Sequence, residues 1–110
     1  SILRQASEQG DFNIENCNYE LLTDEYSVEL LKNLAYFPEI VAQAATNYEP
    51  HRICNYLQIL ASSFHKFYNN NKVITEDKEQ TESYLALITA VKITLRNALE
   101  LIGVSAPEKM

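Results

Sequence analysis

The chain has 110 residues, 46% of them hydrophobic, and a formal net charge of −6. This length and apolar content suffice for one domain with its own core and exclude a multidomain protein. Proteins that hold nucleic-acid backbones regardless of sequence concentrate Lys and Arg, so the acidic balance argues against that class and leaves room only for a local basic strip. No apolar stretch approaches the roughly 20 residues of a membrane span, so we expect no membrane insertion.

The cysteines and the start of the chain indicate its cellular compartment and its place in a longer protein. Cys17 and Cys54 form neither a Cys-x-x-Cys pair nor a dense disulfide pattern, which predicts two reduced thiols in a cytoplasmic protein. The chain begins SILRQASEQ, which reads as the last turns of a helix. We therefore expect residues 1–110 to be a single domain of a longer protein, truncated on its N-terminal side.

The first half predicts a loop followed by two helices. The polar, Asn-rich stretch DFNIENCNYELLTDEY favours a loop, because Asn and Asp prefer local turn bonds to helix interiors. Pro38 then interrupts an apolar stripe with helical spacing, which predicts two helices near 26–36 and 38–47 or one kinked helix. The residues of this stripe are Leu30, Leu34, Phe37, Val41, Ala44 and Tyr48.

The second half predicts two longer helices. Pro50 suits the first turn of a helix that ends at Asn69 to Asn71, and Thr75 or Asp77 can cap the next one. Gly103 is expected to end that last helix in the left-handed conformation. The two apolar stripes comprise Ile53, Leu57, Leu60, Ala61, Phe64 and Phe67, and then Tyr84, Ile88, Val91, Leu95, Leu99 and Ile102. The predicted fold class is all-α, an antiparallel helical bundle, and Val73-Ile74 is the only weak strand signal.

Catalytic chemistry is not indicated. His51, Cys54 and His65 could share a helix face, but a zinc site needs three or four converging ligands and no further partner has a recognisable spacing. The sequence has no Gly-rich phosphate loop and no nucleophile with an evident base beside it. We therefore expect no metal, no cofactor and no bond chemistry in this domain.

The seven tyrosines offer a different function, because an aromatic ring can stack on an unpaired base. Helical spacing predicts that Tyr48, Tyr56 and Tyr84 are packed in the bundle. Tyr68 closes a helix next to an Asn run and Lys72, so a ring, amide donors and a cation meet at one bundle end. The pattern equally suits a helix-terminal tyrosine beside a polar turn.

Three segments carry a resemblance to a known family. They are LLKNLAYFPEIVAQAATNYEPHR, EPHRICNYLQILASSFHKFYNNNKVI and RNALELIGVSAPEKM. The chain resembles the C-terminal anticodon-binding domain of bacterial-type arginyl-tRNA synthetases, the all-helical DALR class. The likeness covers nearly everything after Asp24, and SILR is similar to the end of that domain's opening helix. The family's ending is close to Gly-Val-x-x-Pro-Glu-Arg-Met; Lys109 here keeps the charge of the arginine and loses its planar fork.

The resemblance implies an RNA contact at Tyr68 and at the tail. It places Met110 and Tyr68 against the same anticodon bases, and it gives Lys72 where relatives can carry a second aromatic residue. The predicted tRNA-binding residues are Tyr68, Lys72, Met110, Lys109, Lys66 and Arg4. The four cations among them would carry the salt-sensitive part of binding. The Asp-Ala-Leu-Arg signature and the HIGH-type and KMSKS-type catalytic elements would lie upstream.

The implied parent is a cytoplasmic arginine-tRNA ligase, whose catalytic domain would use ATP and Mg²⁺ while this domain recognises the anticodon loop. Arginine codons share a central G, so the anticodon presents a central C. The expected partners are arginine tRNA and the parent's catalytic domain, without a membrane. Two alternatives remain: an acidic helical protein-protein interaction module, and the related domain of another class I synthetase, against which the ending VSAPEKM argues.

Overall fold

The structure is a computed structural model that describes residues 18–105, with the side chains of 104 and 105 left out. A short 3-10 helix, η2 (Tyr19–Leu21), precedes four α-helices in this part of the chain. They are α2 (Glu25–Ala35), α3 (Phe37–Asn47), α4 (His51–Asn70) and α5 (Lys78–Ser105). Residues 18–105 contain no strand, Val73 and Ile74 included, so the predicted all-α class is confirmed.

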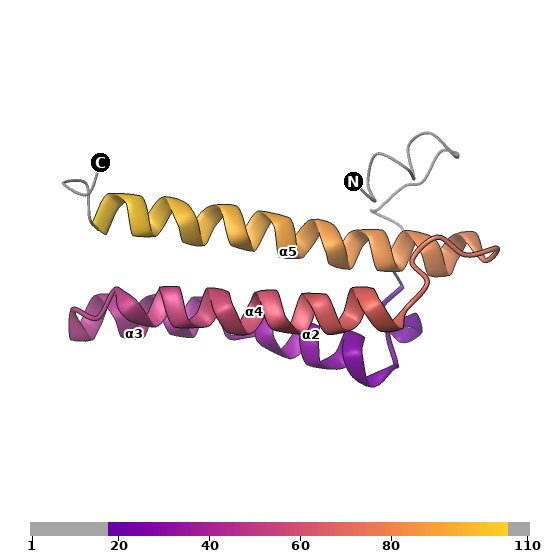
Figure 1. The fold of residues 1–110 in the computed structure, drawn as a ribbon, viewed down its shortest axis with the longest axis horizontal. Coiled ribbons are helices and arrows are strands. Elements are labelled where there is room, and N and C mark those ends of the chain that lie inside the picture. The colour runs from indigo at the N-terminus through magenta and orange to yellow at the C-terminus, as the bar shows by residue number, and fades with distance from the viewer. Residues whose placement is uncertain (1–17, 106–110) are drawn as a thin grey trace.

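The helices form an antiparallel bundle (Figure 1). α2 and α3 follow one another along one side of α4, and α5 runs back along another side of α4. The loop between Asn70 and Lys78 reverses the chain. The end of α4 therefore lies beside the start of α5, and the end of α5 lies beside the start of α4.

One capping residue and one proline set the starts of α2 and α3. Asp24 caps α2, because its carboxylate accepts hydrogen bonds from Ser27 N at 3.1 Å and Ser27 Oγ at 2.7 Å. α2 ends before Tyr36, and Pro38 lies in the first turn of α3, where its missing N–H costs nothing. The prediction of two helices around Pro38 is confirmed.

The predicted cap at the start of α5 is confirmed, and the predicted cap at its end is wrong. Asp77 Oδ1 accepts from the backbone N–H of Glu79 at 3.0 Å, so Asp77 caps α5. Gly103 has no positive φ, and α5 continues through it to Ser105, so the left-handed cap predicted there is wrong. A glycine inside a helix costs about 1 kcal/mol relative to alanine, which does not end a helix whose neighbouring turns stay packed, and Leu101 and Ile102 pack on the core.

The core lies between α2, α4 and α5. Leu30, Leu60 and Phe67 are fully buried at its centre. A smaller cluster joins Ala44 of α3, Ile53 near the start of α4 and Ala98 toward the end of α5. The predicted stripes therefore face the core, with two exceptions: Tyr48, at the end of the first stripe, is 91% exposed, and Leu99, in the stripe of α5, is 60% exposed.

Asp24 links the ends of α2 and α4, and its removal is expected to destabilise the fold. Burial by itself raises the pKa of the Asp24 carboxyl, but hydrogen bonds from Ser27 and Asn71 lower it overall, below its ordinary value of 3.8. We expect Asp24→Ala to lower the free energy of unfolding by about 1 kcal/mol at pH 7, measured by urea titration.

The pH dependence of that loss follows from the sign of the shift. A carboxyl whose pKa is lower in the folded state stabilises the fold above its unfolded pKa and loses this effect as the pH falls through the folded pKa. The difference between the wild type and Asp24→Ala should therefore shrink below about pH 4. Glu25→Ala, an exposed neighbour in the same turn, is the control, and an equal loss there would contradict the capping role.

Candidate nucleic-acid interface

Tyr68 is an exposed ring with a rigid backing. It lies in the last turn of α4 with 44% of its surface exposed, and its ring stacks on Phe64, one turn earlier, with centroids 6.0 Å apart and planes at 25°. Its neighbour Phe67 is fully buried and meets Tyr84 of α5 edge to face at 5.5 Å, which fixes the backbone. Tyr68 can therefore offer a pre-oriented ring surface to a base. The sequence placed Phe64 in an apolar stripe, but its contact with Tyr68 was not predicted, although the spacing of four residues is a signal for it.

The Asn run closes the helix beside this ring. Asn70 Nδ2 donates to the Lys66 carbonyl at 2.7 Å, and Asn71 Nδ2 donates to the Phe67 carbonyl at 3.0 Å and to Asp24 Oδ2 at 3.2 Å. These two amides add side-chain hydrogen bonds to carbonyls in the last two turns of α4. Asn69 is exposed, and its side chain bonds to no other described residue. Of the three amides, Asn69 is therefore the one that has no described partner and that suits a contact with a base edge.

Lys72 and Lys66 have different surroundings. Lys72 is exposed two residues beyond α4, at the same bundle end as Tyr68. Lys66 instead lines a shallow hollow together with Glu25 and Glu29 of α2. The two carboxylates beside Lys66 would repel a phosphate. Of these two lysines, Lys72 is therefore the better placed to bind RNA together with Tyr68.

The C-terminal tail starts at the other end of the bundle. Arg4, Lys109 and Met110 lie outside the described residues. Tyr84, which contacts the neighbour of Tyr68, is separated from Ser105 by 21 residues of helix, or about 32 Å. Five residues beyond Ser105 span at most about 18 Å. Contact of Tyr68 and Met110 with the same bases stays a prediction of the resemblance, and the described helices favour separate contacts.

Of the three tyrosines predicted to be packed, two are. Tyr56 is buried, its hydroxyl donates to the Asn33 carbonyl, and burial raises its pKa to about 12. Tyr84 is partly buried, and burial, followed by the charge of Asp24, raises its pKa. Tyr48 is 91% exposed, so its predicted burial is wrong: it follows the last turn of α3 in the left-handed conformation, with φ of 56°, and this turns its side chain out of the stripe.

The described residues show no metal centre. His51 is exposed and pairs with Glu49 at 3.5 Å, and Cys54 and His65 are exposed on the same helix. Among the described residues, no three His, Cys, Asp or Glu side chains come together in a way that could hold a metal ion. None of the helices in this part of the chain is long and apolar enough to cross a membrane.

The comparison with family models decides what the bundle is. The model described as "DALR anticodon binding domain" matches residues 1–110, the whole chain. The chain belongs to this DALR family. The predicted family membership is thereby confirmed, and the exposed Tyr68 ring lies in a domain of the class that binds anticodons.

Three curated relatives of this DALR domain are named arginine-tRNA ligase. The chain is 50% identical over 110 residues to an arginine-tRNA ligase of Staphylococcus carnosus, 48% to one of Staphylococcus epidermidis and 51% to one of Staphylococcus aureus. Each match covers 100% of this chain and 20% of the relative, so the chain spans a fifth of their length. No solved structure matches the chain.

Proposed function

We propose that the chain recognises the anticodon loop of arginine tRNA as one domain of an arginine-tRNA ligase. The observation that carries this proposal is the match of the whole chain to the DALR anticodon-binding family, together with about 50% identity to ligases of that name. Tyr68, backed by Phe64 at the end of α4, gives the proposal a physical site.

The chemistry of the proposed site suits a central C. Cytosine presents an N4 amino donor and the O2 and N3 acceptors. The side-chain amide of Asn69 can pair with such an edge while Tyr68 stacks on a base, and Lys72 can contact a phosphate. Of the predicted cations that the structure describes, only Lys72 lies beside Tyr68. The affinity should therefore depend weakly on salt concentration, because each phosphate contact releases about one counterion.

The rest of the reaction would belong to the longer protein. ATP and Mg²⁺ would be used by the parent's catalytic domain, and arginine would be joined to tRNA there, in the cytoplasm. This domain would orient the tRNA and needs no cofactor of its own. The lengths of the relatives, five times that of the chain, support this division of labour.

Titration with anticodon stem-loops tests the proposal. We expect the chain to bind a stem-loop with a central C about 5- to 150-fold more tightly than the same stem-loop with a central U, because an unpaired polar group at the mismatch costs about 1–3 kcal/mol. NMR shift changes should centre on the end of α4. Equal affinity for both stem-loops, or no binding of either, would contradict anticodon recognition.

A further inference from the structure

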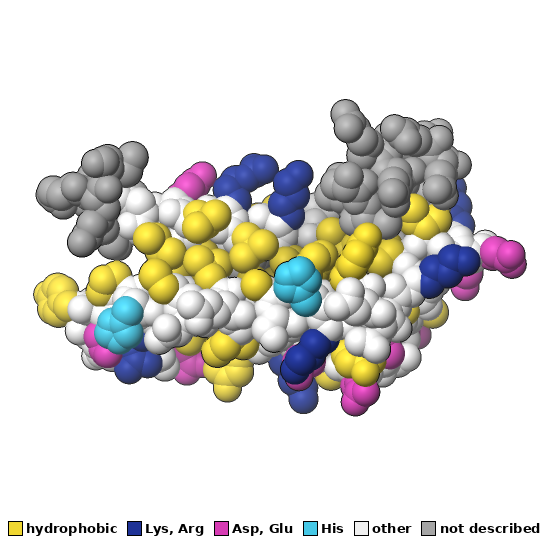
Figure 2. All heavy atoms as spheres, in the orientation of Figure 1, with side chains coloured by type: hydrophobic (Ala, Val, Ile, Leu, Met, Phe, Trp, Pro, Cys, Tyr) yellow, Lys and Arg dark blue, Asp and Glu magenta, His cyan; other side chains and the backbone are white. Residues whose placement is uncertain are grey.

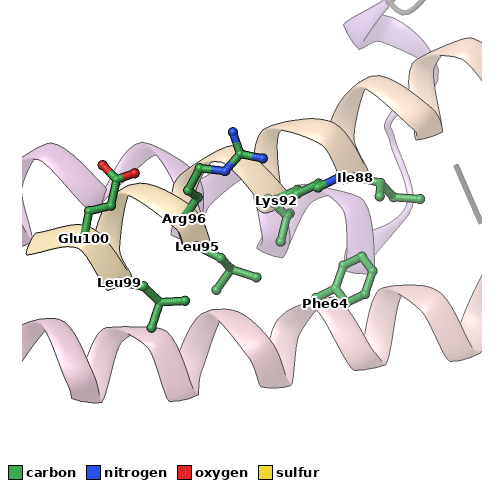
Figure 3. Close-up of a pocket in the computed structure, with 8 residues that line it drawn as sticks. Phe64, Ile88, Lys92, Leu95, Arg96, Leu99 and Glu100 are labelled. Carbon is green, nitrogen blue, oxygen red and sulfur yellow. The ribbon is translucent and has the colours of Figure 1, made fainter. Parts of the chain in front are cut away.

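Two apolar hollows lie beside the last turns of α5. The larger is a groove along the seam of α4 and α5, where hydrophobic side chains gather in Figure 2. Leu95 and Leu99 point there from α5 toward α4, and Lys92, Arg96 and Glu100 carry charges along its edge (Figure 3). The smaller hollow has a volume of about 330 Å³ and lies where the end of α3, the start of α4 and the end of α5 meet. We call it the end pocket.

The end pocket has an apolar wall, and none of the described residues that line it is charged. The exposed ring of Tyr48 forms one side, and its hydroxyl is the only polar side-chain group among these residues. Such a wall suits an apolar group and offers little to a phosphate or a base edge. The other lining residues are Val41, Ala44, Ala45, Pro50, Ile53 and Leu101.

Tyr48 stands at this pocket in a conformation that a tyrosine rarely adopts. It follows α3 with φ of 56° and ψ of 46°, and its N–H donates to the Ala44 carbonyl. This left-handed position after a helix usually belongs to glycine, because a side chain costs free energy there. With 91% of its surface exposed, the ring gains little from the described residues in return. The strained, uncovered ring therefore points to a contact outside the described part of the chain.

The direction in which α5 ends selects between the two hollows. Ser105, the last residue of α5, lies four residues after Leu101, which is about 6 Å along the helix and about 40° around its axis. It lies six residues after Leu99, which is about 120° away around the axis. The chain therefore leaves α5 on the face of the end pocket and not on the face of the seam groove. Pro107 follows two residues later, at most about 7 Å from Ser105.

Proline is the apolar residue after α5 that fits this site. Its ring is rigid, and proline-containing segments dock on aromatic-lined surfaces. The residue before a proline is disfavoured in the helical conformation, so Pro107 also accounts for the end of α5 at Ser105, beside the pocket. Met110 is apolar as well, but it lies five residues after Ser105, and fixing it in the pocket would order a longer segment.

We propose that the end pocket seats Pro107, with its ring against Tyr48, and that this contact holds the tail, residues 106–110, on the domain. Tyr48 is then a positioning residue, because it fixes the base from which residues 108–110 extend. A role of the held tail in RNA binding rests on the proposed function. The contact of Pro107 with Tyr48 does not.

NMR spectra of the 110-residue chain without RNA test the contact. We expect nuclear Overhauser (NOE) cross-peaks between the side chain of Pro107 and those of Tyr48, Val41 and Ile53. Tyr36, a ring 56% exposed at the other end of α3, is the control and should give no cross-peak with Pro107. The backbone amides of residues 106 and 108 should have order parameters above about 0.6, the upper bound for flexible backbone.

Removing the ring tests its role. In Tyr48→Ala the cross-peaks of Pro107 with Val41 and Ile53 should be lost, and the order parameters of residues 106 and 108 should fall below about 0.6. Tyr36→Ala should change neither. Tyr48→Gly also removes the ring and relieves the left-handed backbone, so it gives the same readout if Tyr48→Ala fails to fold.

Each other outcome overturns the proposal. Absence of cross-peaks between Pro107 and the end pocket would leave the pocket to another domain or to RNA. Cross-peaks that weaken on dilution of the chain would indicate a second copy as the occupant, and cross-peaks from Met110 in place of Pro107 would indicate the far end of the tail. A tail that stays ordered without the Tyr48 ring would contradict the positioning role.

Arginylation by the proposed full-length ligase tests what the contact does. Tyr48→Ala should lower kcat/KM for arginine tRNA no more than removal of residues 108–110 does, and it should have no further effect once they are removed, because a positioning residue acts only through the groups that it positions. An effect that persists without residues 108–110 would make Tyr48 an RNA contact and overturn its positioning role. The NOEs are measured without RNA, so a ligase that fails to charge arginine tRNA would sink the proposed function and leave the Pro107 contact standing.

Discussion

Replacing Tyr68 by alanine in the proposed full-length arginine-tRNA ligase is expected to lower kcat/KM for arginine tRNA by about 5- to 150-fold, because stacking on a base is worth about 1–3 kcal/mol. The ring is exposed, and Phe64 holds it from behind at 6.0 Å, so little order has to be gained on binding. Steady-state arginylation at varied tRNA concentration measures the effect. KM for arginine at saturating tRNA should stay unchanged, because Tyr68 would touch RNA and not the amino acid.

Two variants separate a stacking contact from a loss of structure. Tyr68→Phe keeps the ring and should retain most of the activity. If the hydroxyl made the essential contact, Tyr68→Phe would instead lose as much activity as Tyr68→Ala. Tyr36→Ala removes another exposed ring, 56% exposed, between α2 and α3. If Tyr68→Ala affects tRNA kinetics no more than Tyr36→Ala does, the anticodon contact lies elsewhere.

The helices could be predicted because the signals that set them are local. Pro38 lies in the first turn of α3, Pro50 directly precedes α4, and Asp77 caps α5 with its own carboxylate, so neighbouring residues are enough to place these bounds. Apolar spacing likewise identified Leu30, Leu60 and Phe67 as core residues, and all three are fully buried.

The failures occurred where a neighbour in space decides the outcome. Gly103 does not end α5, because packing of the adjacent turns keeps the helix going. Tyr48 fits the stripe of α3 by count, yet the left-handed turn after that helix moves its side chain into solvent. Leu99 follows a core pattern without a described partner, and spacing alone cannot tell a covered face from an uncovered one.

The candidate site was predictable in part for the same reason. Tyr68, Asn69 and Lys72 are close in sequence, so their meeting at one end of α4 follows from the helix ending there. Lys66 is equally close, but the hollow it shares with Glu25 and Glu29 depends on α2, which sequence spacing does not place. The distance of Tyr68 from the tail depends on the length of α5. The end of α5 was predicted at Gly103, two residues before Ser105, so this length was nearly correct.

The length of α5 makes a double mutant decisive for the role of Met110. Removing Met110 from the full-length ligase is expected to lower kcat/KM for arginine tRNA by about 2- to 12-fold, since contacts of a thioether with a ring are worth about 0.3–1.5 kcal/mol. Ser105, which carries the tail, lies about 32 Å along α5 from Tyr84. Tyr84 contacts Phe67, the neighbour of Tyr68, so the tail starts at the end of the bundle opposite to Tyr68.

The combined variant, Tyr68→Ala without Met110, should therefore lose the product of the two single losses, from about 10-fold to more than about 1,000-fold. Distant sites without shared partners add their free energies, whereas two groups on one base couple by about 0.5–3 kcal/mol. A loss no larger than that of the worse single variant would show that ring and tail share one base. The five residues after Ser105 would then have to reach Tyr68 from a position other than the one α5 gives them, and the arrangement of α5 described above would be wrong in the RNA-bound enzyme.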